Sequence, residues 1–190
     1  MKNKTYLMII IILAAALTTA CSVEPESETL LSYQPAASGT QEPISSVDPG
    51  YGAAGSFTNT DIALEQMLIY AIQDEYLARS EYEYIIDELD GGTPFTNIIR
   101  SEESHISLLI PLFEAYGYDI PADTSASHLI IPVSITEALE TGVKAEIDNI
   151  AMYEKFLESN LPDDVAAVFI ELRDASKNHL DAFQRKLSRS

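Results

Sequence analysis

From residue 61 onward, apolar side chains recur at the spacing of an α-helix and form a stripe along one face of each segment. The first segment spans residues 61–89, and its stripe advances in alternating steps of four and three residues. Gly91 and Gly92 follow and are expected to end the helix. The stripe positions are Leu64, Leu68, Ala71, Glu75, Ala78, Tyr82, Ile85 and Leu89.

A second helical pattern covers residues 95–116 and stops at Gly117. Pro111 lies inside this segment, where it removes a backbone donor and clashes one turn back, so we expect a kink there. Residues 118–133 lack the pattern and are expected to form a long loop. The stripe of this helix comprises Ile98, Glu102, His105, Leu109, Leu112 and Tyr116.

Two further helices are predicted in the C-terminal part of the chain. One opens with a capping box, Ser134 to Glu137, and continues to about residue 159. The other begins after Pro162 and runs to about Leu187. Their stripes comprise Leu139, Val143, Glu146, Ile150, Tyr153 and Leu157, and then Val165, Phe169, Leu172, Ser176, His179 and Phe183.

Four amphipathic helices with no strand pattern predict an all-α fold. The first and third connections are short and the second is long. This order predicts a four-helix up-down bundle over residues 61–190, with a long connection between the second and third helices.

The N-terminus has the pattern of an export signal. Lys2 and Lys4 precede an uncharged, apolar run that is too short to span a membrane comfortably. The segment 17–21 resembles a lipoprotein lipobox, although Thr18 stands where an apolar residue is usual. We therefore expect residues 1–20 to be a signal peptide of the lipoprotein type and Cys21 to be lipidated. The alternative is an uncleaved N-terminal anchor. Either reading predicts export and tethering to the outer face of the cytoplasmic membrane or of another envelope membrane.

Residues 21–60 have the composition of a linker. They contain four of the nine prolines, four of the eight glycines and no Lys or Arg. This composition predicts a flexible acidic tether with a reach of about 35 Å.

The charge of the chain excludes one class of partner. Its 30 acidic and 11 basic residues give a formal net charge of −19. Such a surface repels phosphate backbones, so nucleic-acid binding is not expected. With one cysteine, the chain cannot form an intramolecular disulfide.

Polar residues interrupt the apolar stripes near the middle of all four helices. A carboxylate in an apolar core costs several kcal/mol unless it is paired or bound to a cation. Single glutamates on two helices and Glu-x-x-His on the others form the ligand set of di-metal carboxylate bundles. The interrupting residues are Glu75, Glu102, His105, Glu146, Ser176 and His179.

These residue types indicate iron. Carboxylates can bridge two hard cations, and neutral imidazole binds iron well. We therefore predict metal ligands at Glu75, Glu102, His105, Glu146 and His179. Two iron ions fit best, while one ion or another divalent metal is the alternative.

The fourth helix departs from this ligand set, because Ser176 stands where a second bridging Glu is expected. Asn149 and Asp148 are candidate substitutes. Tyr82 and Tyr153 either pack in the core or donate hydrogen bonds to the ligand carboxylates.

Metal-free interpretations also exist. Glu75 could pair with Arg79, Glu102 could face solvent, and the histidines could be hydrogen-bonded core residues. In addition, Glu75 and Glu102 lie at different distances from the first helix–helix connection. The offset of roughly 6–10 Å requires staggered packing or an earlier start of the second helix.

Several segments in order resemble the DUF2202 family, whose members are functionally uncharacterised. The resemblance covers about residues 61–187 and implies a ferritin-like four-helix domain with a di-iron site. It carries the metal-ligand role onto the same five residues predicted above, and it implies that Ser-x-x-His on the fourth helix is a family trait. The matching segments are Asp74–Arg79, Phe95–Ile98, Ser101–His105, Tyr116–Gly117, Glu137–Leu139, Gly142, Glu146–Asp148, Ser176–Leu180 and Ala182–Phe183.

The sequence thus predicts an exported, membrane-tethered metalloprotein that oxidises Fe(II) or reduces dioxygen or peroxide. A closed storage cage does not suit a lipid anchor and a long tether. The alternatives are a non-redox Zn or Mn module and a metal-free helical interaction domain. A homodimer is also compatible with the sequence.

Overall fold

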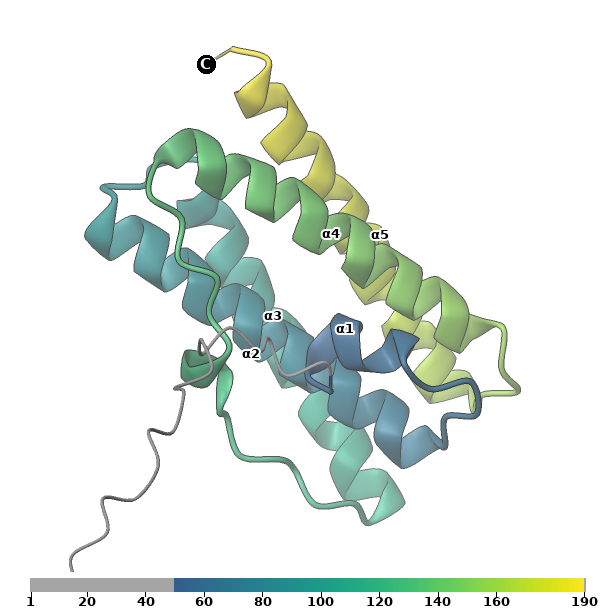
Figure 1. Ribbon diagram of the computed structural model, residues 1–190. Coiled ribbons are helices and arrows are strands. Elements are labelled where there is room, and N and C mark those ends of the chain that lie inside the picture. The colour runs from purple at the N-terminus through teal and green to yellow at the C-terminus, as the bar shows by residue number, and fades with distance from the viewer. Residues whose placement is uncertain (1–49, 190) are drawn as a thin grey trace, which may run out of the picture. The chain divides into compact units, whose positions relative to one another are not determined.

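The computed structural model describes residues 50–189, which contain helices and no strand. The all-α prediction is therefore confirmed (Figure 1). The predicted signal peptide, Cys21 and most of the predicted tether lie outside the described residues. The helices are α1 (Gly52–Phe57), α2 (Leu64–Glu88), α3 (Phe95–Tyr116), α4 (Ile135–Leu157) and α5 (Asp163–Leu187), with a 3-10 turn, η1 (Ser125–Ser127).

The boundaries of the long helices follow the signals in the sequence. Gly117 ends α3 in the left-handed conformation, with φ of 70°. The Ser134 side chain accepts a hydrogen bond of 3.2 Å from the Glu137 amide at the start of α4. The α3 helix continues through Pro111 to Tyr116. α2 begins at Leu64, three residues later than predicted, because Ala63 is still extended.

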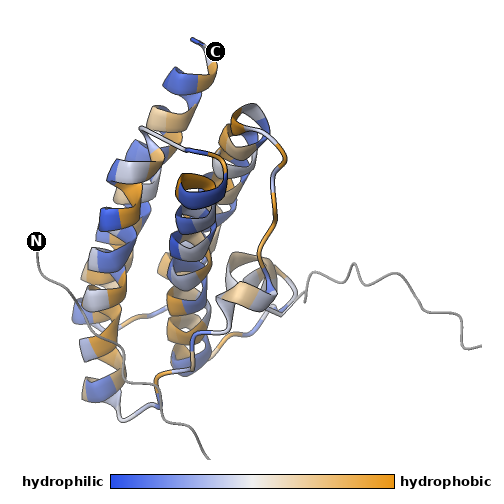
Figure 2. Cartoon of the chain, turned by 90° about the vertical axis from the view of Figure 1, so that its left-hand side faces the viewer, coloured by the Kyte–Doolittle hydropathy of each residue, from blue (hydrophilic) through white to orange (hydrophobic). Residues whose placement is uncertain are grey.

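The long helices form two hairpins. α2 packs against α3 and α4 packs against α5, while contacts of α2 with α4 and of α3 with α5 join the pairs. Figure 2 shows hydrophobic and hydrophilic positions alternating around each helix, as amphipathic helices require. None of the helices within residues 50–189 is long and apolar enough to cross a membrane.

The buried apolar side chains form two clusters at different levels of the bundle. One contains Leu68, Leu109, Phe156 and Phe169, among others. The second contains Tyr82, Phe95, Leu139 and Phe183. In the sequence of every long helix, the buried Glu, His or Ser residues fall between members of the two clusters. The bundle therefore carries a polar layer enclosed by apolar packing.

The predicted tether boundary at residue 60 is wrong. Residues 52–57 form α1, which packs on α2 and α4, and Tyr51 is only 6% exposed. The glycines here serve close packing rather than flexibility. A Cβ on Gly55 would lie 2.5 Å from the Gly50 carbonyl and 2.6 Å from the Tyr70 ring. Gly52 adopts φ of 56°, which an L side chain rarely tolerates.

Candidate metal centre

The polar layer brings together all five side chains that the sequence predicts as metal ligands. Each is buried, with exposed fractions from 1% at Glu75 to 8% at His179. The four long helices all contribute, because each stripe carries its polar residue near mid-length. The five are Glu75 from α2, Glu102 and His105 from α3, Glu146 from α4 and His179 from α5.

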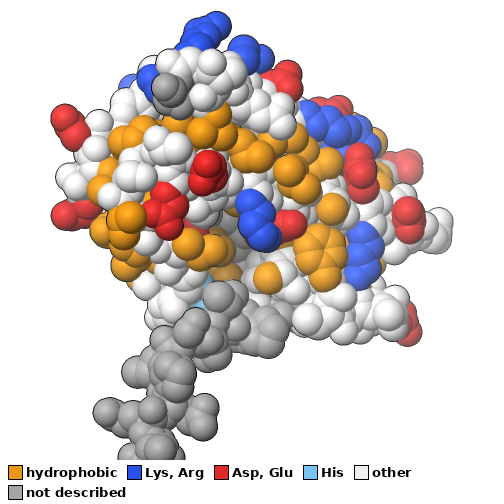
Figure 3. Space-filling model, turned by 45° about the horizontal axis from the view of Figure 1, so that its top comes forward, with side chains coloured by type: hydrophobic (Ala, Val, Ile, Leu, Met, Phe, Trp, Pro, Cys, Tyr) orange, Lys and Arg blue, Asp and Glu red, His pale blue; other side chains and the backbone are white. Residues whose placement is uncertain are grey.

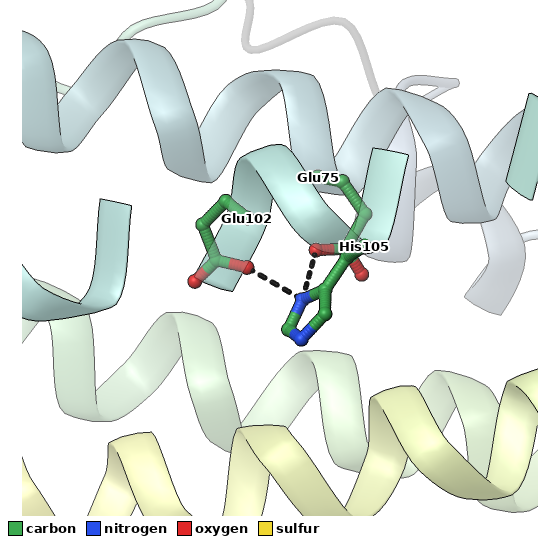
Figure 4. A group of neighbouring side chains, drawn as sticks. All are labelled: Glu75, Glu102 and His105. Carbon is green, nitrogen blue, oxygen red and sulfur yellow. Dashed lines mark hydrogen bonds and ion pairs between the residues drawn. The ribbon is translucent and has the colours of Figure 1, made fainter. Parts of the chain in front are cut away.

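The first group centres on the Nδ1 atom of His105. This nitrogen lies 3.0 Å from Oε2 of Glu75 and 2.8 Å from Oε2 of Glu102. Figure 4 shows the three side chains pointing toward one another from two helices. One nitrogen and two carboxylates thus converge on a single point.

The second group centres on the Nδ1 atom of His179. It lies 3.2 Å from Oε1 of Glu102 and 3.4 Å from Oε1 of Glu146. Within each group the candidate ligand atoms are all within 4.8 Å of one another, so either group could hold a metal ion. Glu102 belongs to both groups and turns one oxygen toward each histidine.

Two of the metal-free interpretations do not describe these contacts. Arg79 forms an ion pair of 2.6 Å with Asp123 on the long loop, and not with Glu75. Glu102 is 2% exposed and therefore does not face solvent. The six residues between α2 and α3 can span about 20 Å, which accommodates the axial offset between Glu75 and Glu102.

Two tyrosines donate hydrogen bonds to Glu75 and Glu146, the glutamates that each belong to only one of the two groups. The Tyr153 hydroxyl donates to Oε1 of Glu75 at 2.7 Å, and the Tyr82 hydroxyl donates to Oε1 of Glu146 at 3.0 Å. Burial, together with the adjacent carboxylates, raises the pKa of both phenols well above the ordinary value, so they remain donors. Glu75 and Glu146 therefore each have one carboxylate oxygen held in place by a tyrosine hydroxyl.

Ser176 is turned away from the two histidine groups. Its hydroxyl donates to Asn149 Oδ1 at 2.7 Å and contacts the Leu172 carbonyl at 3.0 Å. Asn149 in turn donates to Asp74 Oδ2 at 2.6 Å, and the Ala53 amide donates to Asp74 Oδ1 at 2.8 Å. A hydrogen-bonded chain thus links α5 through α4 and α2 to α1. The other candidate substitute, Asp148, pairs with Lys144 at the surface.

Asp74, which is half-buried, and Glu81, which is buried, are enclosed acids that reasoning from the sequence missed. Neither lies on the predicted apolar stripe of α2, because that stripe contains only the positions expected to face the other three long helices. α1 and the long loop cover a second face of α2, so these off-stripe positions are also enclosed. The feature of the sequence that could have indicated this additional packing is the cluster of small residues at positions 52–55, just before the predicted helix.

The electrostatics of the cluster depend on how the carboxylates are paired. Burial raises the pKa of Glu75 and of Glu146 to about 7. At Glu102 burial acts in the same direction, but contacts with His105 and His179 outweigh it and lower the pKa to about 2. Glu102 is therefore the carboxylate that stays ionised.

The two histidines respond to the same carboxylates. Burial acts to lower the pKa of each, but the neighbouring glutamates outweigh it and raise the pKa to about 10 at His105 and about 9 at His179. Protons on the two rings thus supply positive charge between the carboxylates. A divalent cation at either position would supply the same positive charge.

The surroundings of His179 are also compatible with a metal ion. Its Nδ1 is buried and makes no hydrogen bond of good geometry within residues 50–189, although two carboxylate oxygens lie within 3.4 Å. A cavity of about 10 Å³ adjoins the three glutamates that are candidate ligands. Oxygen and imidazole ligands of this kind suit iron, manganese or zinc.

Comparison with known proteins places this bundle in a family. The model of a family described as "Uncharacterized protein domain (DUF2202)" matches residues 65–190, which contain all five candidate ligands. Uncharacterized protein MJ0754 of Methanocaldococcus jannaschii is 27% identical over 136 residues, covering 64% of this chain and 73% of the relative.

A solved structure supports the fold. The crystal structure of hypothetical protein MJ0754 aligns with a TM-score of 0.60 and 26% identity, covering 69% of this chain and 84% of that chain. This relative is therefore similar to the chain in both sequence and fold.

Proposed function

The chain belongs to the DUF2202 family, and on that premise we propose that it is an exported, membrane-tethered, ferritin-like metalloprotein with a non-haem iron centre. Its reaction is the oxidation of Fe(II) or the reduction of dioxygen or peroxide. The buried Glu/His groups could bind metal, and the identity of the ion and the reaction are the proposed part.

The single observation that carries the proposal is the position of Glu102. Its Oε2 lies 2.8 Å from Nδ1 of His105, and its Oε1 lies 3.2 Å from Nδ1 of His179. A carboxylate shared in this way could help to hold a cation in either histidine group, or in both. Occupancy of one group alone is the simpler variant of the same site.

The histidines are arranged for ligation through Nδ1. At His105 the other ring nitrogen, Nε2, lies 3.1 Å from the Ser101 hydroxyl. When Nδ1 binds a cation, the ring proton resides on Nε2 and can be donated to Ser101. This contact would fix the tautomer and the ring orientation.

Bound iron would supply the electrons for reducing an oxidant, which the side chains themselves cannot supply. The protein contributes the surroundings. Glu75 and Glu146 are oriented by the tyrosine hydroxyls, and the apolar clusters on both sides limit access of water. These features support a redox role over simple storage.

A second function, non-redox binding of Zn or Mn, is favoured by one specific feature. Ser176 replaces the second shared carboxylate and is committed to Asn149. The site therefore offers three carboxylates instead of four, which lowers the negative charge available to stabilise an oxidised metal pair. A metal-free interaction domain is the third alternative, in which the histidine protons alone balance the carboxylates.

The proposed export and tethering rest on the N-terminal part of the sequence. The two lysines, the short apolar run and Cys21 support a lipid anchor, and the linker supports a domain held away from the membrane.

Oxygen consumption distinguishes the alternatives. The full-length chain is loaded anaerobically with Fe(II), or with Zn(II), and then exposed to oxygen in an electrode chamber. We expect rapid uptake with Fe(II) in the wild type and in Glu103→Gln, whose side chain is exposed. Glu102→Gln should be slower by about tenfold or more, because it removes the negative charge of the shared carboxylate. Equal rates in both variants would reject the proposed centre, and metal binding without uptake would favour the non-redox module.

A further inference from the structure

A pocket of about 310 Å³ lies outside the Glu/His cluster, between α1, α2, α4 and the long loop. Its apolar wall includes Ala53, Leu77, Ile130 and Ala145. Figure 3 shows a hollow on this side of the domain, bordered by hydrophobic side chains and by acidic and basic ones. The volume is at the lower end of the range for small-molecule sites.

Two carboxyl groups line this apolar pocket without a cationic partner. Glu81 is 5% exposed, and its Oε1 accepts a hydrogen bond of 3.2 Å from the Ile130 amide. Its Oε2 has no hydrogen-bond or ion-pair partner among the described residues 50–189. Asp74 is the other acid, and it accepts only from neutral donors, Ala53 and Asn149.

The basic residue of the pocket does not neutralise these acids. Lys144 lines the pocket, but its side chain is 76% exposed and forms an ion pair with Asp148 on the next turn of α4. The inner end of the pocket therefore carries unpaired acidic groups, while Lys144 and Asp148 at the rim neutralise each other.

Tyr51 provides a second open polar group. It lines the same pocket and is 6% exposed, and its ring stacks on His128 at 4.0 Å between centroids. Its hydroxyl is buried beside Thr124 without completing a hydrogen bond of ordinary geometry. A buried hydroxyl left open in this way is costly unless a ligand or water meets it.

We propose that this pocket binds a small organic cation, an alkyl- or arylammonium whose ammonium group pairs with Glu81 and whose apolar part packs against Leu77 and Ile130.

The lining selects this class of ligand over its rivals. Anions would meet two carboxyls, and a hydrated metal ion would gain little from the apolar wall. A neutral apolar molecule would leave the open oxygen of Glu81 unpaired. Burial raises the pKa of Glu81 to about 7, and an ammonium beside it would favour the ionised carboxylate.

The pocket adjoins the candidate metal centre without containing any of its ligands. Asp74 and Ala145 line both this pocket and the small cavity beside the three ligand glutamates. A bound cation would thus lie one side-chain layer from the centre. The ammonium site itself does not depend on metal, so it can be tested on metal-free protein.

The test uses benzylamine as the probe, with benzyl alcohol and benzoate as neutral and anionic analogues. Binding to the full-length, metal-free chain is followed by the backbone amide resonance of Ile130, which donates to Glu81. We expect saturable binding of benzylamine with a Kd on the order of 1 mM, and no saturation with benzoate.

Variants locate the site. Glu81→Gln keeps an acceptor for Ile130 and should weaken benzylamine binding at least tenfold, or about the value of one charge-assisted contact. Glu83→Gln removes the same charge from an exposed position and should leave binding unchanged. Leu77→Trp should block the pocket for benzylamine and benzyl alcohol alike. Equal binding of benzoate and benzylamine, unchanged affinity in Glu81→Gln, or absence of saturation with benzylamine would each overturn the proposal.

Discussion

Glu102 and Glu81 show how pairing decides the behaviour of equally buried carboxyls. Their exposed fractions are 2% and 5%. Burial acts to raise the pKa of Glu102, but two histidines outweigh it and the pKa falls to about 2. At Glu81 the hydrogen bond from the Ile130 amide lowers the pKa by less than burial raises it, so the pKa rises to about 7. The first is therefore a charged ligand candidate, and the second is a site for an incoming cation.

Glu81 should make the domain less stable as pH rises. Its folded pKa of about 7 lies above its ordinary value of 4.5, so the folded state holds the proton more tightly. The stabilisation from protonated Glu81 is fully present below about pH 4.5. It is lost as the pH rises to about 7, and the loss in the free energy of unfolding is roughly 3 kcal/mol. Urea unfolding near pH 5 and near pH 8 should therefore show a smaller pH dependence in Glu81→Gln than in wild type. Glu83→Gln is the control, and an equal pH dependence in all three proteins would contradict this assignment.

At the scale of elements, the long helices were predictable because one repeating stripe defines each of them. The start of α4 at Ser134 and the end of α3 at Gly117 follow from capping residues a few positions away. The mid-helix candidate ligands were predictable for the same reason, since they interrupt the stripes. α1 was not predictable, because its six residues show too little periodicity and its glycines resemble a linker. The enclosure of Asp74 was missed with it, since α1 covers part of that half-buried position.

The close packing of α1 gives a prediction with an unusual sign. Replacing a helical glycine by alanine ordinarily stabilises a helix by up to about 1 kcal/mol. In Gly55→Ala the new Cβ would instead meet the Gly50 backbone and the Tyr70 ring, so we expect α1 to separate from α2. Hydrogen exchange of the amides in residues 52–57 should accelerate. Gly92→Ala, where a Cβ meets nothing within 4 Å, is the control. Unchanged exchange in Gly55→Ala would show that α1 is not held by this contact.

At the scale of the whole chain, charge and N-terminal pattern divide the sequence into parts with different roles. Lys2 and Lys4 are the only charged residues among the first 20, so the remaining residues carry −21. That charge would keep an exported domain away from anionic lipid and nucleic acid. A few of these carboxylates are different, because they lie in the polar layer or in the neighbouring pocket.

Lipidation at Cys21 is tested by the mass of the mature chain made in a bacterial host. We expect the wild type and Ser22→Ala to lack residues 1–20 and to carry the added mass of lipid. Cys21→Ala should show neither change, because the modified side chain is absent. A wild-type chain that retains its first 20 residues and carries no lipid would instead indicate an uncleaved anchor.

The most direct test of the central claim is the ratio of iron to protein. The full-length chain is reconstituted with Fe(II) without oxygen, freed of loose metal by gel filtration and assayed for iron. We predict between about one and two ions per chain in the wild type and in Glu103→Gln, and a loss of most of this iron in Glu102→Gln. Less than about one ion per wild-type chain, or an undiminished ratio in Glu102→Gln, would show that the Glu/His cluster is not a metal centre.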